Sequence, residues 1–153
     1  MVLRPPGLPL SGTVLILDIC RANYSHEWVE ANWGNALQGK ACPCCRGRCG
    51  YARHAVYQKY HYAEQIEILR VRCRGCRVTH AIMPSFSLPD TSIGTREAEA
   101  YLKGRASGQS RAAAGRCLLE RGLSGDYPRR LERMLEVAVS RGKGLWPQLG
   151  EPS

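Results

Sequence analysis

Two pairs of cysteines constrain what this chain can fold into more than any other feature. Each pair has the spacing C-x2-C: Cys42 with Cys45, and Cys73 with Cys76. A tight turn can bring the two sulfurs of such a pair to one point, where backbone N–H groups can hydrogen-bond the thiolates. Two such turns on neighbouring hairpins would gather four sulfurs in a tetrahedron, which is the geometry that Zn²⁺ accepts. The spacing therefore predicts a structural zinc site with no open position for water.

Further cysteines near these pairs leave alternatives for the ligand set. Cys44 could replace Cys45, and Cys49 could join the site instead. His80 lies four residues after Cys76, but its position is more typical of a strand residue than of a ligand. An iron–sulfur cluster also suits four thiolates. A disulfide framework fits less well, because we expect no secretion signal.

The length and the N-terminal sequence set the expected class of protein. The chain has 153 residues, enough for one modest domain or two very small ones, and six of its eight cysteines fall in one short stretch. Prolines follow Arg4, and Asp18 interrupts the first apolar run, so we expect no secretory signal. No stretch approaches the roughly 20 apolar residues of a membrane span. We therefore expect a cytoplasmic protein without a membrane partner, in which clustered cysteines indicate a metal.

The positive charge is concentrated after residue 40. The net charge is +9; residues 41–90 carry eight basic and three acidic residues, and residues 91–153 carry eleven and seven. Most of the excess is arginine, which suits bidentate contacts to phosphate and guanine. This bias favours a nucleic-acid partner over an inert basic surface.

The pattern along the chain predicts an α+β protein in four segments. They are an N-terminal arm with a short strand (1–40), a zinc ribbon (41–90), a helical domain (91–145) and a tail (146–153). The strand of the arm is expected at Thr13–Cys20, in a run of β-branched residues and leucines. The ribbon is expected to be a three-stranded antiparallel sheet, with strands at Arg53–Tyr60, Gln65–Arg72 and Val78–Met83.

Capping residues divide the helical segment into three expected helices. Thr95 is the expected N-cap of the first, and Ser110 caps a second over Arg111–Arg121. Pro128 fits the first turn of a third helix, which Gly142 should end. Its expected buried stripe consists of Leu131, Met134, Leu135 and Ala138.

The tight turn between the second and third of these helices is typical of a helix-turn-helix, in which the third helix enters the major groove. Arg129, Arg130 and Arg133 lie at its start. Glu132 and Glu136 suggest pairs within the helix. A plain helical bundle or a dimerisation surface is the alternative interpretation.

The order of these motifs resembles the N-terminal zinc ribbon of bacterial insertion-sequence transposases. The matching text is CPCC at 42–45, RVRCRGCRVTHAIMPSFSLP at 70–89 and SGQSRAAAG at 107–115. It is most similar to a family of short, uncharacterised bacterial proteins that keep this ribbon and a helical segment. The resemblance implies DNA binding without catalysis, because no spaced set of carboxylates for two Mg²⁺ ions follows the helices. Cys44 and Cys49 depart from the usual four-cysteine pattern.

Together these features predict a non-enzymatic, zinc-dependent DNA-binding protein, either a transposase-like recognition module or a transcriptional regulator. The candidate nucleic-acid contacts are Arg70, Arg72, Arg74, Arg77, Arg129, Arg130 and Arg133. An alternative is a ribbon that docks on a protein partner, or a homo-oligomer. RNA is a further alternative, because Tyr51, Tyr57, Tyr60 and Tyr62 alternate with basic residues. Candidate nucleophiles and bases exist at Cys49, His54, His61 and His80, but none lies in a recognised catalytic motif.

Overall fold

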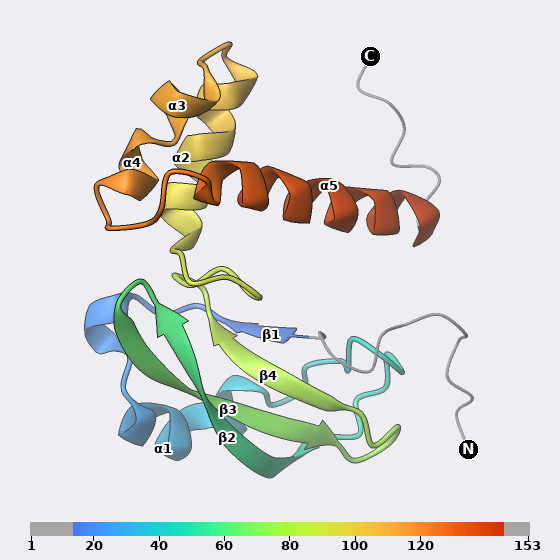
Figure 1. The fold of residues 1–153 in the computed structure, drawn as a ribbon. Helices are drawn as coiled ribbons and strands as arrows, with labels where there is room; N and C mark the ends of the chain where they lie inside the picture. The colour runs from blue at the N-terminus through green and yellow to red at the C-terminus, as the bar shows by residue number, and fades with distance from the viewer. Residues whose placement is uncertain (1–13, 146–153) are drawn as a thin grey trace. The chain divides into compact units, whose positions relative to one another are not determined.

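The computed structural model describes the backbone of residues 14–145 and the side chains of residues 14–137 (Figure 1). The helices are η1 (Arg21–Asn23), α1 (His26–Ala36), α2 (Thr95–Ala106), α3 (Arg111–Ala114), α4 (Arg116–Leu119) and α5 (Tyr127–Leu145). The strands are β1 (Val14–Leu17), β2 (Tyr51–His61), β3 (Glu64–Cys73) and β4 (Thr79–Pro84). The chain divides into two compact units between Ala98 and Glu99. No helix in the described part of the chain is both long and apolar enough to cross a membrane.

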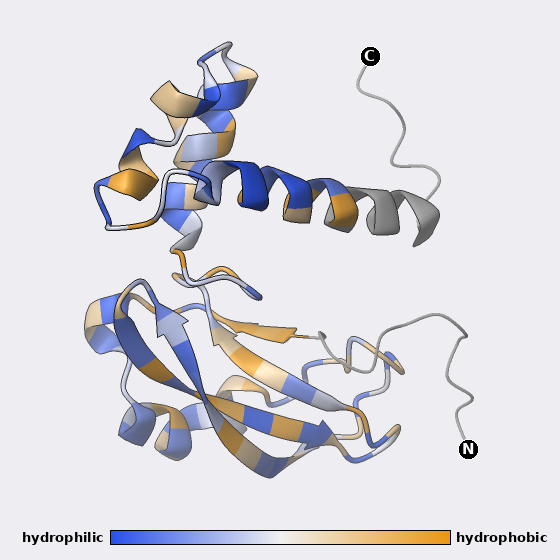
Figure 2. Ribbon diagram, viewed as in Figure 1, coloured by the Kyte–Doolittle hydropathy of each residue, from blue (hydrophilic) through white to orange (hydrophobic). Residues whose placement is uncertain are grey.

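A mixed four-stranded sheet forms the framework of the first unit. Its strand order is β1-β4-β3-β2. Strand β3 is antiparallel to both β2 and β4, as predicted, whereas β1 runs parallel to β4 with Val14 opposite Ala81. The strand that was predicted in the arm, apart from the three-stranded ribbon, is therefore the fourth strand of the same sheet. The apolar run within the expected arm completes the sheet because pairing with β4 buries Leu15 and Leu17. Apolar residues dominate β1 and much of β4 and alternate with polar ones along β3 (Figure 2).

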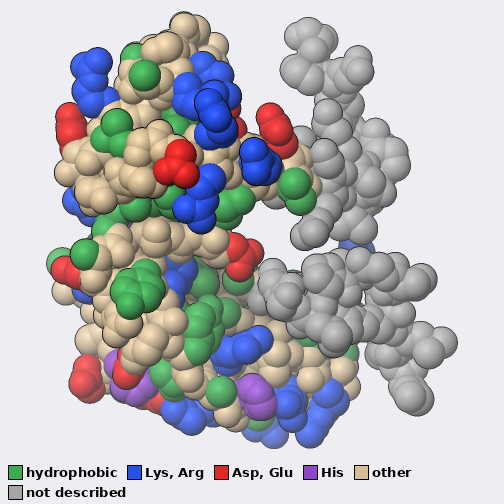
Figure 3. Space-filling model, viewed as in Figure 1, with side chains coloured by type: hydrophobic (Ala, Val, Ile, Leu, Met, Phe, Trp, Pro, Cys, Tyr) green, Lys and Arg blue, Asp and Glu red, His purple; other side chains and the backbone are tan. Residues whose placement is uncertain are grey.

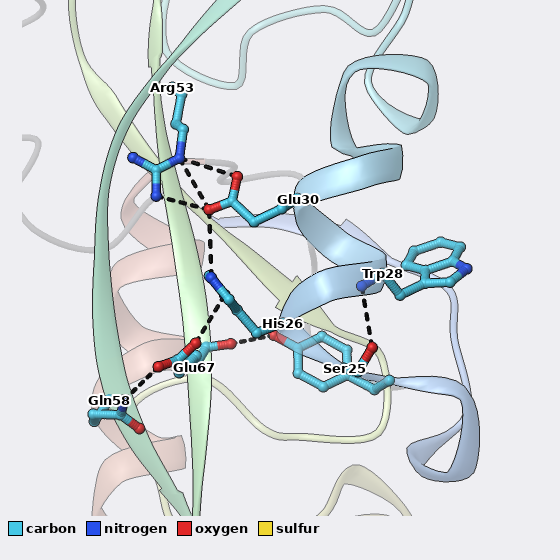
Figure 4. Close-up of polar contacts among 8 residues, drawn as sticks. Ser25, His26, Trp28, Glu30, Arg53, Gln58 and Glu67 are labelled. Carbon is cyan, nitrogen blue, oxygen red and sulfur yellow. Dashed lines mark hydrogen bonds and ion pairs between the residues drawn. The ribbon is translucent and has the colours of Figure 1, made fainter.

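Helix α1 is fastened to the hairpin by a polar network (Figure 4). Ser25 caps the helix by accepting a hydrogen bond from the backbone N–H of Trp28. Glu30 on α1 accepts hydrogen bonds from the Arg53 guanidinium of β2, the shortest at 2.7 Å. His26 Nδ1 lies 2.9 Å from a carboxylate oxygen of Glu67 on β3. The residues before position 41 that the structure describes therefore belong to the same compact unit as the cysteines.

The segment after β4 is pinned to the sheet by a buried lysine. Lys59 Nζ donates to Ser87 Oγ at 2.8 Å and to the Thr91 carbonyl at 2.5 Å. Burial lowers the pKa of Lys59 to about 8. Ile93, in the same segment, is completely buried. These contacts therefore hold the segment between β4 and α2 against the sheet.

In the second unit, one carboxylate on α5 connects this helix to α2 and α3 by hydrogen bonds. Glu132 on α5 accepts hydrogen bonds from Tyr101 Oη at 2.5 Å and Arg105 Nε at 2.7 Å, both on α2. It also accepts two from the Arg111 guanidinium of α3, at 3.0 and 2.7 Å. These bonds hold the pKa of Glu132 at about 2, with the Arg111 bond the largest cause. The expected intrahelical pairing of Glu132 is therefore wrong: its partners lie on other helices.

Other helix expectations had mixed outcomes. Ser110 is the N-cap of α3 as predicted, and Pro128 lies in the first turn of α5. Thr95 is already inside α2, and its hydroxyl donates to the Ser85 carbonyl instead of capping the helix. The expected helix over 111–121 breaks at Gly115, where a Cβ would lie 2.7 Å from a side-chain carbon of Pro128. This close approach lets α5 pack on the break.

The third helix also differs from its prediction in length and in its stripe. It continues past Gly142 to Leu145, because one glycine weakens a helix without having to end it. Leu131 is buried, but Met134 is 38% exposed. Ala138, the last member of the expected stripe, and the tail at 146–153 lie outside the described side chains.

Candidate metal centre and basic surface

The first cysteine pair forms a compact turn between α1 and β2. The Cys42 N–H donates to the Gly47 carbonyl at 2.9 Å, and the Arg46 N–H donates to the Cys42 carbonyl at 2.8 Å. Cys42 Sγ accepts from the Cys44 N–H, and Cys45 Sγ accepts from the Gly47 N–H, both at 3.4 Å. The turn therefore points backbone donors at both sulfurs, as a thiolate ligand requires.

The second pair, between β3 and β4, repeats three of these four hydrogen bonds. The Cys73 N–H donates to the Val78 carbonyl at 2.9 Å, and the Arg77 N–H donates to the Cys73 carbonyl at 3.0 Å. The Val78 N–H donates to the Cys76 sulfur, just as the Gly47 N–H donates to the Cys45 sulfur. We call the two turns, residues 42–47 and 73–78, the knuckles. In each knuckle the arginine that follows the second cysteine has a positive φ: 60° at Arg46 and 67° at Arg77.

The two knuckles bring their four cysteine sulfurs together. All four Sγ atoms lie within 4.8 Å of one another. Cys42 Sγ is 3.7 Å from Cys76 Sγ, and Cys45 Sγ is 3.8 Å from Cys73 Sγ. A tetrahedron of sulfurs around zinc at about 2.3 Å has edges of about 3.8 Å, so the cluster fits one tetrahedral metal ion. The four cysteines singled out by spacing could therefore hold a metal.

The remaining candidate ligands fall outside this cluster. Cys44 occupies a turn position within the first knuckle, equivalent to Gly75 in the second. Cys49 is exposed, and its sulfur lies over the two knuckle glycines: a Cβ on Gly75 would come within 2.7 Å of it, and one on Gly47 within 3.2 Å. Within the described residues, neither cysteine joins the group of converging sulfurs.

His80 lies beside the cluster as a strand residue of β4. It is completely buried, and its Nε2 is 3.2 Å from Cys42 Sγ. Burial lowers the pKa of His80 and keeps the imidazole neutral. With its proton on Nε2, the ring donates a hydrogen bond to the Cys42 sulfur, which is the supporting role common around metal–thiolate sites.

The cluster is electrostatically suited to a cation. Burial raises the pKa of Cys42 and of Cys76, whereas the Gly47 N–H lowers the pKa of Cys45 to about 7. Four crowded thiols therefore do not all ionise by themselves. A divalent cation would stabilise all four thiolates and release their protons.

The arginines predicted on β3 lie on one face of the strand. Because side chains alternate along a strand, Arg70 and Arg72 lie opposite to Val71 and Cys73. The Arg70 guanidinium stacks on the Tyr57 ring, 5.8 Å from its centroid. The Nε atoms of Arg70 and Arg72 are buried and have no hydrogen-bond partner among the described residues. Neither side chain forms an ion pair within the described part of the chain.

The other predicted arginines are exposed. Arg74 follows Cys73 and donates from Nε to the Tyr51 carbonyl at 3.2 Å, and Arg77 follows Cys76. Lys and Arg side chains gather near the place where β3 ends and β4 begins, at the lower right of the view (Figure 3). Arg129, Arg130 and Arg133 are exposed in the first turns of α5.

The tyrosines considered as a stacking surface do not share one face. Tyr51 is buried, and Tyr62 accepts a hydrogen bond from the Gly94 N–H. Tyr57 and Tyr60 are exposed, but they are three residues apart on β2 and therefore lie on opposite faces of the sheet. The hairpin offers no joint aromatic platform.

Sequence reasoning missed Arg46 as a candidate contact. It follows Cys45 as Arg77 follows Cys76, and it is exposed like its counterpart. Aligning the two C-x2-C-R motifs with each other would have shown this equivalence.

A comparison with protein families gives one match. The model of the family described as "Domain of unknown function (DUF6431)" matches residues 42–121. The chain belongs to this family. The matched region begins at the first cysteine of the cluster and includes both knuckles and helices α2, α3 and α4. No curated protein and no solved structure matches the chain.

Proposed function

We propose that this DUF6431 protein is a non-enzymatic DNA-binding protein whose binding surface is organised by structural zinc. The ligands are Cys42, Cys45, Cys73 and Cys76. The spacing of their sulfurs suits a single ion, which favours zinc over a cluster of several irons. Because cysteine fills every ligand position, the metal has no place for a reacting water, and its role is to stabilise the fold.

One observation carries the DNA-binding proposal: the arginines predicted to contact nucleic acid differ from those that pair with a glutamate. Arg21, Arg53, Arg105 and Arg111 each pair with a glutamate. The seven arginines predicted to contact nucleic acid form no ion pair within the described residues. The charge of an unpaired arginine is not offset by a neighbouring carboxylate, and a set of such arginines indicates a polyanionic partner.

The positions of the unpaired arginines suggest a different kind of DNA contact for each unit. Those of the sheet unit lie on β3 and at the second knuckle, where they suit contacts to the phosphate backbone. Arg129, Arg130 and Arg133 occupy the start of α5, the position from which a recognition helix reads the major groove. We therefore propose a helix-turn-helix role for α3, α4 and α5, as in the DNA-binding part of insertion-sequence transposases.

Metal analysis combined with DNA titration tests this function. Mass spectrometry of the metal released from the purified full chain should find one zinc per protein molecule. Fluorescence anisotropy with a labelled duplex should show binding that weakens about 100-fold between 50 and 200 mM salt, as about four phosphate contacts require. Absent binding at low salt would rule out the proposal.

A protein partner is the second candidate, favoured by exposed apolar side chains on the helical unit. Leu102, Leu119, Met134 and Val137 are between 38 and 47% exposed. Such residues favour contact with a protein or with a second copy of the chain. Light scattering of the purified protein that shows a dimer without affinity for DNA would support this candidate over DNA binding.

A further inference from the structure

Both knuckles carry an arginine in a conformation that favours glycine. Among described residues other than glycine, only Arg46, Tyr62, Arg77 and Asp90 have a positive φ. Two of these four thus occupy the same position in twin turns. In the left-handed region the Cβ of an L-residue crowds the backbone, whereas glycine adopts this region freely. Each knuckle therefore carries a conformational cost that glycine would avoid.

No local partner accounts for these two side chains. Both are exposed, and neither forms an ion pair or a side-chain hydrogen bond to another described residue. The stretches that contain them, residues 31–63 and 68–89, include no aspartate or glutamate. A left-handed residue that persists in a fold without a local reason points to a functional one.

We propose that Arg46 and Arg77 are paired phosphate contacts, one supplied by each knuckle. This inference rests on the proposed DNA-binding function and extends it to a residue outside the predicted set. Each arginine directly follows a cysteine of the cluster, so the metal that fixes the sulfurs also fixes the starting points of both side chains. The guanidinium group suits this role because it binds phosphate oxygens through two parallel hydrogen bonds.

The knuckles also explain why the metal centre can lie at a nucleic-acid surface. Four thiolates and one divalent ion carry a net charge of −2, which would repel a phosphate. An arginine at each knuckle offsets that charge and leaves the surrounding arginines in excess. The metal centre is then part of the contact surface as well as its scaffold.

Replacing each knuckle arginine by glycine distinguishes a role in DNA binding from a role in folding. In the full, zinc-loaded chain, Arg46→Gly and Arg77→Gly should keep one zinc per molecule and should melt at the wild-type temperature or above it, because glycine relieves the positive φ. Each should weaken duplex binding about eightfold at 100 mM salt and lower the slope of log K against log salt by about 0.9. Arg46→Lys and Arg77→Lys should retain most of the slope.

Two controls complete the experiment. Lys103→Gln removes a charge already paired with Glu99 at 2.7 Å, and should leave the salt slope unchanged. Asp90→Gly relieves a positive φ outside the knuckles, and should not weaken binding. Unchanged affinity and slope in the Arg46→Gly, Arg77→Gly double variant would overturn the inference while wild-type binding stands. Loss of zinc in that variant would overturn it too, by assigning the arginines to the metal centre. No binding by the wild type would instead refute the proposed function.

Discussion

In the sheet unit, four cysteines from two turns converge on one point, whereas in the helical unit one carboxylate collects hydrogen bonds from two helices. Both arrangements fasten small elements that bury little apolar surface alone. The sheet unit uses the two knuckles, whose four thiolates a divalent cation would stabilise. The helical unit uses Glu132, whose charge is already matched by Arg105 and Arg111. One unit should therefore depend on a bound ion and the other on internal charge.

Cys73→Ser should have the largest effect and should affect the sheet unit alone. It removes a ligand, and with it most of the metal-binding free energy, which for structural zinc sites is on the order of 10 kcal/mol or more. Two-dimensional NMR should show the signals of residues 41–83 collapse, while those of α2 to α5 persist. The control is Cys49→Ser, outside the cluster, which should retain zinc and fold. Cooperative melting of Cys73→Ser with unchanged metal content would show that the ligands are wrong.

Glu132→Gln should have the next largest effect and should affect only the helical unit. The amide keeps the shape but loses the charge, and it can no longer accept all the bonds from Tyr101, Arg105 and Arg111. We expect a loss of about 2–3 kcal/mol in unfolding free energy, measured by urea denaturation of the helical signal. Glu136→Gln, exposed on the same helix, is the matched control. Equal effects of the two variants would contradict the role of Glu132.

The same comparison explains what the sequence could predict. The cysteine cluster was predictable because each ligand pair lies within four residues and its spacing is specific to metal turns. Strand β3 was predictable from its alternation of apolar and polar residues, and β2 and β4 were predicted on either side of it. Glu132 was not predictable, because a glutamate beside arginines on a helix has the same pattern whether it pairs within the helix or across to another. Strand β1 was recognised, but its partner β4 is far away in sequence, and local pattern does not specify such pairing.

The stability of the helical unit at acid pH should differ between the wild type and Glu132→Gln. The pKa of Glu132 is held at about 2, below its ordinary value of 4.5, mainly by the Arg111 bond. A lowered carboxyl pKa contributes stability that is complete above pH 4.5 and is lost as the pH falls through 2. The helical signal of the wild type should therefore weaken over this range, while the variant, already without the charge, should show a flatter profile. Parallel profiles would contradict the assignment.

Arg130→Ala should have the smallest effect, and it tests the division between paired and unpaired arginines. Arg130 stacks over Tyr127 at 5.8 Å and is exposed, so its loss should leave the melting temperature within error. Duplex affinity should fall about eightfold at 100 mM salt, because one phosphate contact and its released counterion are lost. Arg111→Ala is the informative counterpart: its guanidinium is engaged by Glu132, so its removal should lower stability and leave the salt slope nearly unchanged. If both variants lowered the slope equally, the pairing of arginines would not determine which of them bind DNA, and the observation that carries the proposed function would lose its force.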